Sequence, residues 1–396
     1  MRLPWSSLLL LSAGIFVAVT SEFLPIGLLP QLRDELGITE AQVGLLITVF
    51  AGTVVVATAP LTHVTRTVPR KRLLVALLAV FAVANLIAAL APGYAVLVVA
   101  RIIGGAAHGV FWAVVSPYAA RLVTPDRLAR AVAIATSGAT GATVAGVPLG
   151  TLLGAAVGWR ASFAVIAGLV VVIAALIIAV LPPVEHRAGD AAAAALPMPR
   201  RDATIVPVVV LCATVVLVTL GHATFYTYIA AWVIEVAGFE AGAVAGILLL
   251  FGAAGALGVV MAGVLGDRFP RALLPVLLVG VALSVAALAA QPAAVVVLLV
   301  LWSTFLGGVP VIFQARLLQT ASPALRDIAA AWLTVAFNIG IGGGALLGGI
   351  VIGAWSLAAL PLVTVACLLA ALVLVAVVAL LAKRAEAQIS TESAAS

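Results

Sequence analysis

Four ionisable side chains interrupt stretches of the sequence that are otherwise apolar, namely Glu22, Arg101, His108 and His222. Such groups are costly in apolar surroundings, so their presence there indicates a functional role. A carboxyl group and an imidazole can each take up and release a proton, and a guanidinium can act as a fixed counter-charge. These residue types favour proton binding and release, with Glu22 as the only acid in the interior of any of the apolar stretches.

His108 follows Arg101 by seven residues, which is nearly two helical turns, so both side chains are expected on one helix face. Trp112 comes one turn later on that face. Because histidine titrates near neutral pH, we predict that His108 relays protons or hydrogen-bonds a substrate. A histidine that is simply hydrogen-bonded between two helices is the alternative.

Further aromatic and amide side chains could orient a small ligand. Rings stack on a ligand, and polar tips hydrogen-bond it in a mostly apolar pocket. The candidates are Trp112 from the first half of the chain and His222, Tyr226, Tyr228, Trp302, Phe313, Gln314 and Asn338 from the second. Each of them, taken alone, is also compatible with packing between helices.

The elements that carry these residues must lie in lipid. Of 396 residues, 65% are hydrophobic and only 9% are charged, whereas a soluble domain has about 25% charged residues. Backbone groups in lipid must bond internally, which leaves helix bundles or closed barrels. Continuous apolar runs such as 73–90 do not alternate as barrel strands do. We therefore predict an all-α polytopic membrane protein.

A spanning helix takes about 20 apolar residues, and the charge clusters divide the chain into twelve such segments. They cover approximately residues 7–30, 41–61, 72–91, 95–119, 129–156, 161–181, 205–234, 242–265, 271–290, 293–317, 327–353 and 356–382. With a cytoplasmic N-terminus, 17 of the 20 Lys and Arg residues fall on the cytoplasmic side, as the positive-inside rule requires. We expect both termini in the cytoplasm of a bacterial-type inner membrane. The positive charges lie in short loops beside lipid headgroups, so nucleic acid binding is not expected.

The predicted spans form two halves. A polar linker, residues 182–204, separates a first six-span bundle (1–181) from a second (205–382), which a tail (383–396) follows. The basic loop after the second span recurs after the eighth, at an offset of about 201 residues. Parallel six-span repeats are typical of transporters whose two bundles rock about a site near the middle of the membrane.

Several motifs can be compared with known families. They are Gly263-x-x-x-Asp267-Arg268-x-x-Arg271, Arg101 with Gly105 and Gly109, Gly146-Val147-Pro148-Leu149-Gly150, Ser21-Glu22-Phe23 and Gly221-His222. Together they resemble the major facilitator superfamily over nearly the whole chain. They are similar in particular to its twelve-span drug:proton antiporter branch, in the subgroup of chloramphenicol-efflux and arabinose-type sugar-efflux proteins.

The resemblance implies two pseudo-symmetric six-helix bundles, with spans 1, 4, 7 and 10 around a central cavity. It also implies that the loop residues Arg70, Gly263, Asp267, Arg268 and Arg271 hold the inner gate. Gly146, Pro148 and Gly150 would bend the fifth span, and Gly105 and Gly109 would permit close helix contact. The first-half loop departs from the family pattern, because it has Thr62 in place of Gly and Arg66 in place of Asp. Asp267 could still perform the role of that Asp in the second half.

At 1.5 Å per residue, Glu22 lies roughly 21 Å from the cytoplasmic face and Arg101 roughly 10 Å from the outer face. In a hydrocarbon core of about 30 Å these depths nearly coincide. His222 falls in the same outer half. We therefore predict that Glu22 carries a coupling proton, with Arg101 as its counter-charge. The alternative is a static pair of Glu22 and Arg101 that fixes two helices.

The expected function is proton-coupled export of small, weakly polar compounds by alternating access. The partners are a small-molecule substrate, protons and the lipid bilayer; no cofactor is expected beyond the proton gradient, and a monomer suffices. Export of sugars or nucleosides, or a membrane-embedded sensor without transport, are the alternatives. An enzyme is not expected, because paired intramembrane acids, a His-Glu-x-x-His pattern and a phosphate-binding loop are missing from the sequence.

Overall fold

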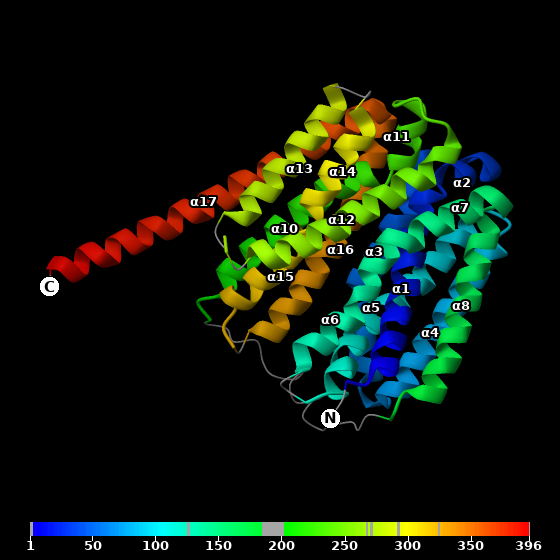
Figure 1. Ribbon diagram of the computed structural model, residues 1–396, viewed down its shortest axis with the longest axis horizontal. Coiled ribbons are helices and arrows are strands. Elements are labelled where there is room, and N and C mark those ends of the chain that lie inside the picture. Colours follow the sequence, from blue (N-terminus) through cyan, green and yellow to red (C-terminus); the bar gives the residue numbers. More distant parts are fainter. Residues whose placement is uncertain are drawn as a thin grey trace.

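The computed structural model describes residues 3–124, 127–183, 202–266, 268–269, 272–290, 294–323 and 325–395. Every regular element within these ranges is a helix (Figure 1). Twelve helical stretches are long and apolar enough to cross a membrane. The predicted all-α fold with twelve spans is therefore confirmed.

The first six spans are built from helices α1 to α8. In chain order these elements are α1 (Trp5–Gly27), α2 (Leu29–Leu36), α3 (Glu40–Val64), η1 (Thr65–Thr67), α4 (Arg70–Ala89), α5 (Tyr94–Arg121), α6 (Leu128–Gly141), η3 (Ala142–Gly146), α7 (Val147–Val157) and α8 (Trp159–Val180). A capping box of Thr39 and Gln42 starts α3, because each side chain satisfies a backbone N–H that the first turn leaves free. The η3 segment is a π-helical turn, so α6, η3 and α7 form a single span.

The other six spans follow in α10 to α17. These elements are α10 (Ile205–Tyr226), α11 (Ile229–Glu235), η4 (Ala241–Ala243), α12 (Val244–Gly266), α13 (Leu273–Ala290), α14 (Val295–Gly307), α15 (Val309–Thr320), α16 (Arg326–Ala354), η6 (Leu357–Ala359) and α17 (Leu360–Ala395). Helices α14 and α15 make one span. The last helix runs on past residue 382, where the sequence analysis placed the start of a tail.

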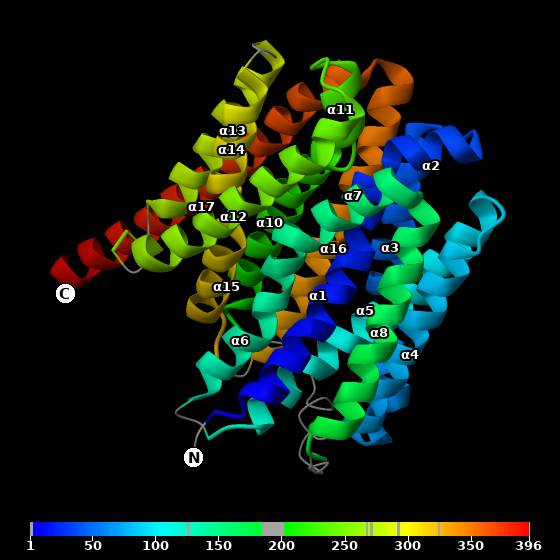
Figure 2. The ribbon, with the colours of Figure 1, turned by 45° about the vertical axis from the view of Figure 1, so that its right-hand side comes forward.

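The first and seventh spans end earlier than predicted, and each is followed by a short helix. Pro25 and Pro30 both lack a backbone N–H, and the chain breaks between them at Leu28, whose ψ is 4°. The seventh span breaks at Tyr228, whose ψ is 14°, although no proline lies there to signal it. The short helices α2 and α11 lie at the same end of the molecule (Figure 2).

Glycines let helices approach closely, and the pattern recurs in both halves. A methyl group on Gly138 of α6 would lie 1.9 Å from Ser12 O of α1. One on Gly344 of α16 would lie 2.4 Å from Leu220 O of α10. Only a residue without a side chain permits such backbone contact. The first and fifth spans of each half thus pack in the same way.

The two groups of helices meet along a seam. We call the end of the molecule that carries α2 and α11 the α2 end, and the opposite end, where α1 and α10 begin, the linker end (Figure 1). The Arg33 guanidinium of α2 pairs with Glu235 of α11, and the Thr48 hydroxyl donates to Gly342 O at 2.9 Å. Hydrogen bonds from Arg33 to Glu40, Asp34 and Glu235 raise the pKa of Arg33. These contacts join the two groups at the α2 end.

The seam also depends on close backbone approach in the middle of the molecule. Helix α12 packs against η3 and α7, and α16 packs against α3. A methyl group on Gly252 of α12 would lie 2.4 Å from Thr143 O of η3. The wider π-helical turn therefore faces a glycine of the opposite group.

We predict that Gly258→Ala destabilises the protein, whereas Gly168→Ala does not. The new methyl group on Gly258 would lie 2.0 Å from Thr304 O, a backbone atom that cannot move aside, but nothing lies within 4 Å of the Gly168 position. Overpacking of this kind costs ~1–3 kcal/mol, while Ala in an uncrowded helix gains up to ~1 kcal/mol over Gly. Thermal unfolding of both purified variants in detergent measures the difference, and equal melting temperatures would contradict the packing described.

Candidate functional site

A proline in α1 prepares the charged site. In an α-helix the N–H of residue 25 would bond to the carbonyl of residue 21, but Pro25 has no N–H. The carbonyl of Ser21 therefore lacks its helical partner. Arg101 of α5 supplies the donor, with Nη1 at 2.8 Å from Ser21 O and Nη2 at 2.6 Å from Glu22 O. The guanidinium thus binds the backbone of α1 where its helical ladder is interrupted.

Arg101 is buried, and its charge is compensated by dipoles and a ring. Its Nε donates to Leu46 O of α3 at 3.3 Å, and its Cζ lies 4.2 Å from the centroid of the Phe50 ring. A cation over an aromatic face is attracted by the quadrupole of the ring. Arg101 accordingly ties α5 to both α1 and α3.

Among the described residues, Arg101 does not form the salt bridge with the Glu22 carboxylate that the alternative of a static pair would require. The ionisable side chain that contacts that carboxylate is His108, with 3.4 Å between Glu22 Oε2 and His108 Nε2. Arg101 instead holds the backbone carbonyl of Glu22. The reason is geometric: Pro25 leaves the neighbouring Ser21 carbonyl without its helical donor, and the guanidinium binds that carbonyl on the backbone of α1.

His108 connects the carboxyl group to an indole. Trp112 Nε1 donates to His108 Nε2 at 2.8 Å, so in this arrangement Nε2 carries a lone pair and the ring proton belongs on Nδ1. That Nδ1 is buried and has no hydrogen-bond partner. The rings of Phe50 and Phe81 stand edge-on to the imidazole, with centroids 5.2 and 6.0 Å away.

This arrangement has room for one more proton. A proton added to His108 Nε2 would be directed to Glu22 Oε2 and would displace the donation from Trp112. A proton on the carboxyl group instead would make Glu22 a donor toward the same nitrogen. The site therefore has one arrangement without the added proton, in which Trp112 donates to His108, and another with it, in which His108 and Glu22 share a hydrogen bond. Both lie inside a shell of aromatic side chains.

Sequence reasoning missed Asn85, which supports the site from α4. The Ser21 hydroxyl donates to Asn85 Oδ1 at 2.8 Å, and Asn85 Nδ2 donates to Phe81 O at 2.9 Å. The side chain is 3% exposed. Within the predicted span 72–91, Asn85 is the one polar residue after Arg72, and that isolation was an available signal.

The second half carries an aromatic cluster made of His222, Tyr226, Phe251 and Trp302. Tyr226 stacks on His222 and on Phe251, with centroids 4.9 and 5.0 Å apart. Trp302 meets His222 and Phe251 edge-on at 5.4 and 5.2 Å. Neither an acid nor a lysine or arginine belongs to this cluster, so three of its predicted ligand-binding residues meet in an uncharged environment.

The aromatic cluster occupies the repeat positions of the charged site. Shifted by the repeat offset of 201 residues, Phe50 corresponds to Phe251 and Arg101 to Trp302. Ser21, whose carbonyl accepts from Arg101, corresponds to His222. In both halves the residue of the fourth span meets a ring of the second span and a residue of the first. The same framework thus holds a cation in one half and an indole in the other.

The remaining predicted ligand residues lie elsewhere. Tyr228 is fully buried; its phenol donates to Ala345 O at 2.6 Å and lies against Gly44 and Gly349 in the seam. Tyr228 therefore packs between the two groups and does not line a cavity.

Three others are on α15 and α16. Phe313 is buried in the core, while Gln314 is exposed. Asn338 donates to Thr334 O at 3.0 Å, and its Oδ1 is buried without a partner. Neither of the two amides contacts the aromatic cluster through a described hydrogen bond.

The predicted gating glycines are packing positions within one half. Methyl groups on Gly105 and Gly109 of α5 would lie 2.6 Å from Phe50 O and 1.8 Å from Thr58 Oγ1 of α3. Those on Gly146 and Gly150 would lie 2.0 Å from Thr20 Oγ1 and 2.4 Å from a Leu24 methyl group of α1. The glycines of the fifth span therefore face α1, and the contact with the other half is made beside them, at Thr143.

Pro148 and the loop residues of the predicted gate differ in burial. Pro148 is buried near the start of α7, Arg70 begins α4 half-exposed, and Gly263 has open space around it. The exposed Arg268 lies 5.7 Å from the centroid of the Phe269 ring. Asp267 and Arg271 lie outside the described residues.

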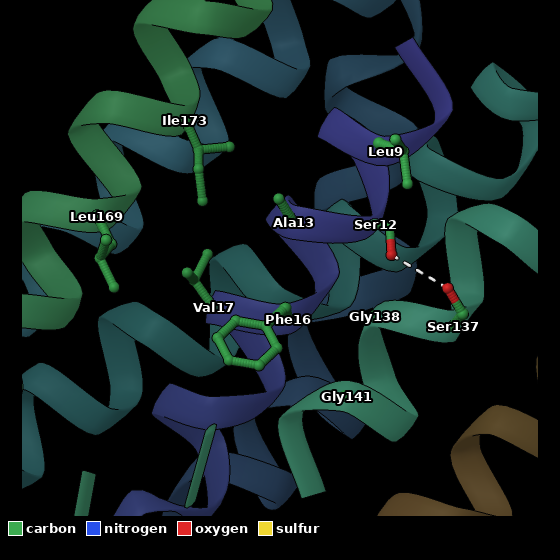
Figure 3. Close-up of a pocket in the computed structure, with 10 residues that line it drawn as sticks. All are labelled: Leu9, Ser12, Ala13, Phe16, Val17, Ser137, Gly138, Gly141, Leu169 and Ile173. Atoms are coloured by element: carbon green, nitrogen blue, oxygen red, sulfur yellow. Dashed lines mark hydrogen bonds between the residues drawn. The ribbon is translucent and has the colours of Figure 1, made fainter. Parts of the chain in front are cut away.

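A groove of about 370 Å³ opens between α1, α6 and α8 (Figure 3). Apolar side chains such as Phe16 and Ile173 form its walls, and Ser12 and Ser137 face each other across 3.3 Å. None of the predicted site residues lines it. The groove is therefore separate from both the charged site and the aromatic cluster.

Comparison with known proteins agrees with this architecture. The sequence model of the Major Facilitator Superfamily matches residues 11–289. The structure is similar to that of a bacterial homologue of the human lysosomal transporter Spinster, in an inward-facing and unoccupied conformation. That match has a TM-score of 0.73 at 15% identity and covers 95% of this chain and 96% of the other.

A second similar structure is that of the human organic anion transporter MFSD10 (TETRAN). It has a TM-score of 0.73 at 14% identity, and the match covers 95% of this chain and 100% of the other. At such identities the structural likeness shows the fold, whereas the sequence match extends over more than half of the chain. This chain belongs to the Major Facilitator Superfamily and has the fold of its membrane transporters.

Proposed function

We propose that this protein is a proton-coupled secondary transporter that exports small, weakly polar compounds across a bacterial-type inner membrane. The observation that carries the proposal is the contact between Glu22 and His108, two proton-binding side chains at 3.4 Å inside a membrane-spanning bundle. Ionisable groups inside a membrane bundle mark proton relays and ion pathways. A static ion pair would have no use for a competing donor, whereas here Trp112 Nε1 donates to the same His108 nitrogen that faces the Glu22 carboxyl group.

Arg101 has a positioning role in this proposal. Three of its N–H groups are directed at backbone carbonyls, so it fixes the backbone of Glu22 and leaves the carboxyl group free to change partners. Its charge is also close enough to favour a negative carboxylate after proton release. The guanidinium would therefore set where the proton is held, without carrying it.

The proposed cycle follows from the two-bundle architecture. Residues 1–181 and 205–382 would rock as two bodies, joined by the linker and with both termini in the cytoplasm. The seam at the α2 end, with Thr48 and Gly342 in contact, would have to open to release substrate outward. One chain supplies both bundles, so a monomer is sufficient for the cycle.

Replacing Glu22 should uncouple transport from the proton gradient. Glu22→Gln keeps the size of the side chain and its acceptor oxygen but removes the exchangeable proton. In proteoliposomes with an imposed gradient of one pH unit, the wild type should build a concentration ratio of up to about tenfold per proton exchanged, and the variant a ratio near one. Flux of antibiotics, sugars and nucleosides across the vesicle membrane measures this.

Glu240→Gln is the matched control, since that carboxyl group is exposed in the loop before α12. It should accumulate substrate as the wild type does. Undiminished gradient-driven accumulation by a folded Glu22→Gln protein would refute the assignment of the coupling proton to Glu22.

Locking the seam should stop transport reversibly. In a protein whose Cys212 and Cys367 are replaced by Ser, Ala51→Cys with Gly342→Cys would join α3 to α16, because a Cβ on Gly342 would lie 3.1 Å from Ala51 Cβ. Disulfides need a Cβ separation of about 3.5–4.5 Å, within a few tenths of an ångström of this. Oxidation should abolish flux, and a reductant should restore it.

The control cross-link stays within one bundle. A Cβ on Gly104 would lie 3.8 Å from Ala84 Cβ, so Gly104→Cys with Ala84→Cys joins α5 to α4 and should leave flux unchanged on oxidation. Full flux through protein that is cross-linked between α3 and α16 would rule out opening at the α2 end.

A further inference from the structure

The aromatic cluster contains buried nitrogen atoms without hydrogen-bond partners. Among the described residues, His222 Nδ1 and Trp302 Nε1 are both buried and unpaired, and Trp302 is 0% exposed. A third unpaired nitrogen, that of the Trp232 indole, belongs to a ring that contacts Phe225, which in turn stacks on Trp302. The four rings of the cluster pack on one another through stacked and edge-on contacts.

Packing alone does not account for these nitrogens. A phenylalanine would supply a ring without a donor, whereas the indole N–H can only donate and is costly when buried without an acceptor. Native structures rarely leave such groups unpaired, and each case requires an explanation. A bound molecule that brings its own acceptor would satisfy the N–H of Trp302.

The composition of the cluster indicates the class of that molecule. Its four rings offer faces and edges to another flat ring. It contains neither an acid that would pair with a cation nor a lysine or arginine that would pair with an anion. The acceptor would therefore be a neutral oxygen atom, such as a carbonyl, on an aromatic compound.

The cluster also has an accessible edge. His222 and Tyr226 are half-buried, whereas Phe251 and Trp302 are buried. A flat molecule that approaches the half-buried pair would meet the remaining rings as it enters. Trp302 stands at the repeat position of Arg101, so equivalent sites in the two halves would bind a proton in one half and an aromatic compound in the other.

We propose that His222, Tyr226, Phe251 and Trp302 bind the aromatic part of the transported compound and that Trp302 Nε1 donates to a neutral acceptor oxygen on it. This assignment rests on the proposed transport function and names its substrate class. The first bundle then binds the proton at Glu22 and His108, and the second bundle binds the transported compound at the aromatic cluster.

Two probes that differ at a single position test the donor. Acetylbiphenyl carries a carbonyl oxygen where isopropenylbiphenyl carries a methylene group, and the two molecules have nearly the same shape. Binding to the purified wild type, measured by ligand-induced thermal stabilisation, should be about fivefold tighter for acetylbiphenyl, as one neutral hydrogen bond provides. Trp302→Phe should reduce that preference to about one while it retains the ring.

Trp232→Phe is the matched control, because it removes another buried, unpaired indole that lies outside the cluster. It should keep the fivefold preference. The proposal is overturned if Trp302→Phe also keeps it, or if the wild type binds neither probe. Should Trp302→Phe not fold, His222→Phe tests the cluster instead: a reduced affinity for both probes supports the assignment, and unchanged affinity refutes it.

Glu22→Gln separates this inference from the transport proposal. It should retain the probe preference while it loses gradient-driven flux. Retained flux in that variant would sink the proton assignment and leave the aromatic site standing. Loss of the preference in Trp302→Phe without any proton-driven flux in the wild type would leave a binding site in a protein that is not a proton antiporter.

Discussion

The charged site depends on one backbone carbonyl that has no helical partner. Pro25 removes the N–H that would have bonded to Ser21 O, and in a membrane such a group must find another donor within the protein. The Arg101 guanidinium fills this requirement and also binds Glu22 O. Its attachment to the main chain is what allows the Glu22 carboxyl group to face His108.

The same framework has been filled differently in the two halves. Phe50 lies below a cation in the first half, and its counterpart Phe251 lies beside an indole in the second. A buried charge needs carbonyl dipoles around it, and the first half provides them through the interrupted helix α1. The second half has no proline at the corresponding break near Tyr228, and it carries rings there instead of a charge. The local backbone and the chemistry of each site are therefore linked.

The sequence was sufficient for features that depend on runs of residues. The lengths of the apolar stretches predicted all twelve spans, because lipid imposes a minimum helix length. The spacing of Arg101, His108 and Trp112 predicted that they share one helix face, and Trp112 does donate to His108 there. The sequence could not show which acceptor Arg101 would choose, since that choice depends on how α1 and α5 meet in space. Nor could it separate Tyr228 from Tyr226, two residues apart, of which one packs in the seam and the other stacks in the cluster.

The closed seam and the two sites constrain one another. At the α2 end the bundles are joined by small residues and by few polar contacts, the Arg33–Glu235 pair and the bond from Thr48 to Gly342 among them. An exposed ion pair contributes only about 0–1 kcal/mol, so the polar contacts add little to this closure. The interior contacts of Arg101 lie within one bundle and would survive an opening of the seam. The proposed proton site at Glu22 and His108 and the proposed aromatic site each lie inside one bundle, so both would change their surroundings during alternating exposure without being taken apart.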